Sequence, residues 1–202
     1  MGIHSNLVDG QILGGHMNDD WQGEQQEIMA VLEPHLPKIS AIYDAAVHMY
    51  NSETSAKARA DHDSRAALNA IYRYAWMGYQ RELMDQNGFH FLKVKGLHVL
   101  NIRDRVVLRA KKVDANGLHT NNQTQQQRDY DRQQPIPGLP LEATRIVVGY
   151  QLDPAFSMVE RVIVRCPSSH WAAQVGVADD RYGWEDITPA RLPFSASGRR
   201  FG

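Results

Sequence analysis

The sequence predicts an α+β domain in which an N-terminal helical hairpin packs on a mainly antiparallel sheet of four to six strands. Apolar residues recur at helical spacing up to Gly88 and at alternate positions after it. Because the helices come first and the strands afterwards, a parallel βαβ winding is not expected. The predicted regions are a flexible leader (1–20), a helical region (21–88), a β-rich region (89–178) and an irregular tail (179–202).

Two helical stretches each have one apolar stripe. The first begins near Trp21, is interrupted by two prolines and continues to Tyr50. The second is clearest over 64–86, where the stripe is rich in aromatic residues, and we expect that stripe to be core rather than a ligand cage. Gly88 is typical of a helix C-terminus, since glycine adopts the left-handed conformation easily.

After the helices the apolar period changes to two. Strands are expected at 89–95, 97–101, 103–113, 144–152, 158–166 and 171–177. A Gln-rich insertion at 121–140 separates the third strand from the fourth, and Thr124 is a suitable N-cap for a short helix inside it.

The charge of the chain is small overall and unevenly spread. The 202 residues have a formal net charge of -1, so no global attraction to nucleic acid or to an acidic membrane is expected. Residues 89–176 contain 12 Lys and Arg but 7 Asp and Glu, a net of +5, which leaves -6 for the rest. This asymmetry predicts two kinds of surface, unless the two parts neutralise each other by packing together.

The expected location is the cytoplasm. Cys166 is the only cysteine, which excludes an internal disulfide and fits a reducing compartment, and we expect it to be a small buried hydrophobe. The N-terminus lacks the basic and apolar regions of a secretory signal. No apolar run approaches the length that spans a membrane.

The strongest functional indication is a row of positive charge in the predicted strand 103–113. Alternate residues of that strand lie about 7 Å apart, similar to the phosphate spacing along one nucleic-acid strand. The candidate contact residues, there and on neighbouring elements, are Arg103, Arg105, Arg109, Lys111, Arg128, Arg145, Arg161 and Arg165. Tyr130 would add stacking. The alternative is a solvated sheet face whose arginines pair with nearby carboxylates.

Histidines suggest two enzymatic alternatives. His90, His98, His119 and His170 lie in the basic half, and two of them would suffice as general base and acid in metal-independent RNA cleavage. Asp61-His62-Asp63 contains a His-Asp doublet, the hallmark of HD-domain phosphohydrolases, and would be the centre of a metal-dependent hydrolase. That fold is all-helical, so we expect one of these aspartates to be a helix N-cap instead.

Other catalytic signatures are missing. The sequence has no GxxxxGK[ST], HExxH, GxSxG or paired CxxC motif. Lys111 and Lys112 look like the lysine strand of PD-(D/E)xK nucleases, but Arg109 and Ala110 stand where those enzymes have an acidic residue. A metal-dependent nuclease of that type is therefore not expected.

Residues 90–175 resemble uncharacterised bacterial proteins, some from mobile-element or toxin–antitoxin settings. The resemblance is greatest over Val106–Val113, the Gln-rich stretch, Ile136–Pro140 and Val148–Asp153. It implies no activity and no catalytic residues, and it favours a regulatory or defence role.

Together, these observations favour a non-enzymatic binding or regulatory protein without a cofactor. Its basic sheet face would contact nucleic acid or an acidic protein, while the helical hairpin docks a second protein or another copy of the chain. The first alternative is a toxin-like, metal-independent ribonuclease that uses two of the four histidines. The second is a metal-dependent hydrolase at Asp61-His62-Asp63.

Overall fold

The computed structural model describes residues 20–114, 118, 124–178 and 181–189. The helices are α1 (Asp20–Leu32), η1 (Glu33–His35), α2 (Leu36–Glu53), α3 (Ala56–Asp61), α4 (Ser64–Leu83) and α5 (Gln125–Asp131). The strands are β1 (Phe89–Val94), β2 (Leu97–Ile102), β3 (Val106–Lys112), β4 (Thr144–Leu152), β5 (Val159–Arg165), β6 (Ala172–Ala178) and β7 (Arg181–Asp186). The leader predicted at 1–20 lies outside the described residues except for Asp20.

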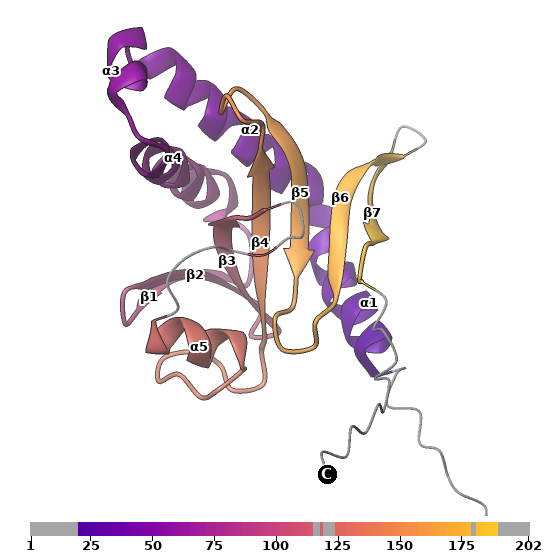
Figure 1. Cartoon of the computed structure of the whole chain (residues 1–202). Helices are drawn as coiled ribbons and strands as arrows, with labels where there is room; N and C mark the ends of the chain where they lie inside the picture. Colours follow the sequence, from indigo (N-terminus) through magenta and orange to yellow (C-terminus); the bar gives the residue numbers. More distant parts are fainter. Residues whose placement is uncertain (1–19, 115–117, 119–123, 179–180, 190–202) are drawn as a thin grey trace, which may run out of the picture.

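The described strands form one sheet in the order of the chain, β1 to β7 (Figure 1). Each neighbouring pair is antiparallel except β3 and β4, which are parallel. The connection between β3 and β4 contains α5 and is long enough for the crossover that a parallel pair requires. The predicted α+β class with a helical N-terminal region is confirmed.

The predicted strand count of four to six is wrong, because the sheet has seven strands. The additional strand is β7, which lies in the segment predicted to be an irregular tail. Its sequence, RYGWED, begins and ends with charged residues and has a central glycine, so its intrinsic strand preference is low. The strand forms instead because it pairs along β6, with Gly183 opposite Gly176.

The main core lies between the sheet and the helical hairpin of α2 and α4. The hairpin helices approach closely at Gly78, where a β-carbon would lie 2.9 Å from Cγ2 of Ile42. Trp76 and Tyr79 of the aromatic stripe of α4 are buried in the core as expected, whereas Tyr72 of the same stripe is half-buried. The Tyr43 hydroxyl donates to the carbonyl of Val148 at 2.8 Å and ties α2 to the centre of the sheet.

A second, smaller core lies on the opposite face of the sheet, beneath α5, which Figure 1 shows apart from the hairpin. Thr124 caps α5 as predicted, because its hydroxyl accepts from the backbone N–H of Gln127 at 3.2 Å. Tyr130 is fully buried, and its hydroxyl lies 2.6 Å from the carbonyl of Val107 and 2.8 Å from that of Ile146. The short helix is therefore anchored on β3 and β4 through one side chain.

The predicted long strand 103–113 is wrong at its start, because β3 begins at Val106. Arg103 and Asp104 have φ values of 53° and 54° and form the turn between β2 and β3. The Arg103 N–H donates to the carbonyl of Gly88 at 2.7 Å, which fixes this turn beside the end of α4. Gly88 has a φ of 80°, the left-handed conformation expected of it. None of the helices in the described part of the chain is both long and apolar enough to cross a membrane.

Candidate functional site

The eight predicted contact residues do not form one exposed row. Strand alternation places five of them on the sheet face beneath α5, namely Arg109, Lys111, Arg145, Arg161 and Arg165. Arg103 and Arg105 lie in the turn before β3 instead, and Arg105 pairs with Glu27 of α1 at 3.2 Å. Arg128 is on α5. The sequence therefore identifies a shared face for most of the set, but α5 covers part of that face.

Burial separates these residues further. Arg145 is 1% exposed and lies beneath the segment that includes α5, where its guanidinium donates to the backbone carbonyls of Asp129 and Gln134. Arg109 is 8% exposed, whereas Arg161 is exposed. A side chain as deep as that of Arg145 stabilises the α5 segment and cannot contact a macromolecule at the surface.

A cationic pocket lies where β2 departs from β3. The two strands pair only as far as Leu108, so the C-terminal half of β3 forms a local edge of the sheet. A cavity of about 260 Å³ opens there between this edge and the N-terminal half of α4. We call it the α4–β3 pocket, and its lining residues are Leu68, Asn69, Tyr72, Arg109, Lys111, Lys112 and Tyr150.

Positive charge in the α4–β3 pocket is concentrated and partly desolvated. Burial, and then repulsion from Arg109, lowers the pKa of Lys111 to about 8, although Asp131 of α5 favours the charged form. Burial also lowers the pKa of the Arg109 guanidinium. That guanidinium lies 5.1 Å from the ring centre of Tyr130 and donates to the side-chain carbonyl of Gln127. Both of these partners are neutral, while Asp131 of α5 also favours the charged form of the guanidinium.

Tyr150 contributes an unusual group to the pocket. Its side chain is fully buried, and its hydroxyl has no hydrogen-bond partner among the described residues. Burial, and then the neighbouring Tyr72, raises the pKa of this hydroxyl above its ordinary value, so it remains a protonated donor at neutral pH. A buried hydroxyl without a partner is costly, which makes this group a candidate for ligand binding.

Further cations surround the pocket. The pKa of His98 on β2 is lowered by burial and by the charges of Lys93, Arg73 and Arg109, so these groups from three elements lie near one another. His98 also stacks on the ring of Trp76, with ring centres 5.4 Å apart. We call the set of Arg73, Lys93, Arg109, Lys111 and Lys112 the α4–β3 basic surface.

The sequence interpretation missed Arg73, Lys93 and Lys112 as members of this surface. They come from a helix and two strands that meet only in the folded chain. One signal was present, because neither 64–81 nor 89–103 contains an aspartate or a glutamate. Two adjacent elements without acidic residues indicate a shared surface of one sign.

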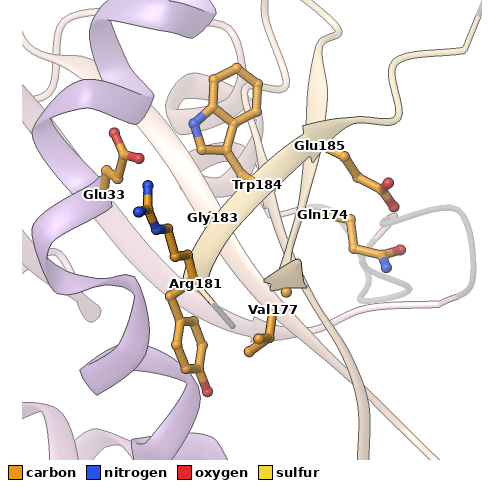
Figure 2. A pocket seen from close by; sticks show the side chains of 9 residues that line it. Glu33, Gln174, Val177, Arg181, Gly183, Trp184 and Glu185 are labelled. Atoms are coloured by element: carbon orange, nitrogen blue, oxygen red, sulfur yellow. The ribbon is translucent and has the colours of Figure 1, made fainter. Parts of the chain in front are cut away.

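A second cavity, of about 360 Å³, lies at the other end of the sheet beside β6 and β7. Figure 2 shows Glu33 of η1 and Arg181 of β7 on the same side of this cavity, with Glu185 on the other side. Trp184 also lines it, and Val177 and Tyr182 expose 61% and 41% of their surface. Because acidic and basic groups are mixed here, this cavity has no net preference for an anion.

The histidines do not converge in the described residues. His90 and His98 point to opposite faces of the β1–β2 hairpin, His170 lies between β5 and β6, and His119 is outside the described residues. Asp63 is the N-cap of α4, accepting from the Ala66 N–H at 2.7 Å, so the predicted capping is confirmed. The described residues contain no group of three or more His, Cys, Asp or Glu side chains that could bind a metal ion.

Comparisons with protein-family models, with curated proteins and with solved structures gave no match for this chain. None of them bears on the resemblance to proteins from mobile-element or toxin–antitoxin settings. The function is therefore inferred from the geometry and charge of the α4–β3 pocket.

Proposed function

We propose that this protein is a non-enzymatic nucleic-acid-binding protein with a regulatory role, and that its contact surface is the α4–β3 basic surface. One observation supports this most directly. Arg109, Lys111 and Lys112 all line one cavity, and no carboxylate is among the lining residues that the structure describes. Such a site attracts an anion, because three cations line it and the nearby Asp131 of α5 offsets only one charge.

The spacing of the cations suits a phosphate backbone. Arg109 and Lys111 are alternate residues of β3, about 7 Å apart, and Arg73 and Lys93 extend the charge onto α4 and β1. Phosphate contacts of this kind supply most of the affinity of sequence-independent binding. The half-buried ring of Tyr72, at the mouth of the same pocket, provides a surface on which a base can stack.

A nucleic acid fits these groups better than an acidic protein does. The pocket combines a guanidinium, two ammonium groups and the Tyr150 hydroxyl, all of which are donors, within one small cavity. A phosphate group presents several oxygens around one atom, whereas a carboxylate presents two in a plane. If an acidic peptide bound and nucleic acid did not, the α4–β3 basic surface would be a protein-binding site instead.

The experiment is a binding titration of the purified full chain with labelled single-stranded and duplex DNA and RNA. The test variant is Lys111→Gln/Lys112→Gln, and the matched control is Arg132→Gln/Arg181→Gln, which neutralises two exposed arginines away from the pocket. If the test variant no longer engages two phosphates of a single strand, the slope of log K against log salt should fall by about 1.4. The control should change it far less.

Two results would overturn the proposal. Equal losses in the two double variants would mean that net charge, not this surface, determines binding. Cleavage of the RNA during the titration would favour the ribonuclease alternative, so the length of the labelled strand is checked in the same samples.

A further inference from the structure

We propose that the α4–β3 pocket binds a phosphomonoester, the dianionic phosphate at the end of a nucleic-acid strand, in preference to the diester within a strand. This inference rests on the proposed function, because it specifies which part of the nucleic acid enters the pocket.

The donors in the pocket outnumber the oxygens that a diester provides. Three cationic side chains and Tyr150, whose buried hydroxyl has no partner among the described residues, line the same cavity, and Asn69 of α4 adds an amide. A diester within a strand has two unbridged oxygens and one negative charge, whereas a terminal phosphate has three such oxygens and a charge close to -2 at neutral pH. One oxygen of the terminal phosphate can therefore accept from the buried Tyr150 hydroxyl while the other two pair with the ammonium and guanidinium groups.

The size of the cavity also favours a chain end. A volume of about 260 Å³ is just below the usual range for small-molecule sites and suits a phosphate with its attached sugar. The inner wall includes Tyr150 from the central strand β4, which is fully buried. A strand that continued in both directions would have to pass over the mouth of the pocket, and its phosphates would not reach that hydroxyl.

Tyr150 is fixed before any ligand binds. Its ring packs against that of Tyr43 with centres 4.7 Å apart, and its backbone pairs with that of Lys112 in the β3–β4 register. The hydroxyl and the Lys112 side chain are thus placed at one cavity by the rigid part of the sheet. Tyr150 therefore has little conformational freedom to lose when an anion binds.

The test compares oligonucleotides of one sequence that differ only at their ends. Strands with a 5′-phosphate, a 3′-phosphate or hydroxyl ends are titrated against the full chain by fluorescence anisotropy. One phosphorylated strand should bind roughly tenfold more tightly than the hydroxyl-ended strand, as expected for an added hydrogen bond to a charged group. Tyr150→Phe should abolish this preference, whereas the control Tyr74→Phe, on α4 but outside the pocket, should preserve both the preference and the affinity for the hydroxyl-ended strand.

The outcomes separate this inference from the proposed function. Equal affinity for all three strands, lost in Lys111→Gln/Lys112→Gln, would overturn the end preference and leave the nucleic-acid function standing. A preference that survives Tyr150→Phe would also overturn the inference. If no strand binds but a nucleoside monophosphate does, with dependence on Tyr150, the pocket assignment stands and the nucleic-acid function falls.

Discussion

Replacing Tyr43, Tyr79 or Tyr150 by phenylalanine removes the same hydroxyl group from three different hydrogen-bonding environments. The Tyr43 hydroxyl donates to the Val148 carbonyl at 2.8 Å and accepts from Tyr79 at 3.0 Å. Among the described residues, the Tyr79 hydroxyl bonds only to the Tyr43 hydroxyl. The Tyr150 hydroxyl has no partner among the described residues. All three side chains are fully buried, so solvent exposure does not distinguish them.

The expected losses of unfolding free energy follow from what each deletion leaves unpaired. Tyr43→Phe removes two hydrogen bonds and leaves the buried Tyr79 O–H without its acceptor, which should cost about 1–3 kcal/mol. Tyr79→Phe removes one bond while Tyr43 keeps its carbonyl partner, which should cost about 0.5–1.5 kcal/mol. Tyr150→Phe removes a hydroxyl that makes no bond, so stability should change by less than about 0.5 kcal/mol or increase.

The assay is chemical denaturation of the wild type and the three variants, with the denaturant slope compared among them. An unchanged slope ensures that the shift in midpoint reports stability rather than a change in the denatured state. If Tyr150→Phe were as destabilising as Tyr43→Phe, the Tyr150 hydroxyl would be satisfied in the free protein. It would then not be available as a free donor to a ligand, and the assignment of the pocket as a phosphate site would be wrong.

Three further changes test separate parts of the structure. The affinity of the α4–β3 pocket for an anion should fall as the pH rises above about 8, because Lys111, whose pKa is lowered to about 8, loses its charge there. Binding titrations at pH 7 and pH 9.5 should show this fall, and Lys111→Arg should abolish it. Gly149→Ala would place a β-carbon against the methyl groups of buried Val113 and should lower the free energy of unfolding by about 1–3 kcal/mol. An unchanged stability in denaturation would mean that Val113 is free to move. Asp63→Ala should lower the free energy of unfolding by about 1 kcal/mol through loss of the α4 cap. Added zinc should not change the stability of the wild type or of the variant, and a zinc-dependent stability of the wild type would restore the metal-site alternative.

Local patterns predicted the elements whose determinants lie close together in the sequence. The stripe of α4, its end near Gly88 and the caps at Asp63 and Thr124 depend on residues three or four positions apart. Strand β7 was missed because neighbouring β6, rather than its own residues, stabilises it. The start of β3 was missed because a left-handed turn at two non-glycine residues, Arg103 and Asp104, has no reliable signature in one sequence.

The candidate site was only partly predictable, because period two identifies a face of a strand but not its depth. Alternation correctly grouped Arg109 with Lys111, yet it gave no indication that α5 would bury Arg145 beside them. The pocket itself requires β2 to leave β3 at Leu108 and α4 to lie over the exposed edge. Both are tertiary features, and neither leaves a local pattern in the sequence.

The buried arginines and the open pocket are parts of one arrangement. Arg109 and Arg145 are bonded mainly to neutral groups of the α5 segment, an amide oxygen in one case and backbone carbonyls in the other. These partners accept hydrogen bonds but carry no charge, while Asp131 favours the charged forms of Arg109 and Lys111 and Asp129 favours that of Arg145. A carboxylate in the place of Gln127 would pair with Arg109 and reduce the positive charge of the pocket by one. The neutral glutamine therefore keeps the pocket cationic, and its amide also donates to Asp131 at 2.7 Å. Gln127→Glu should weaken anion binding and also destabilise α5, because it would place two carboxylates side by side.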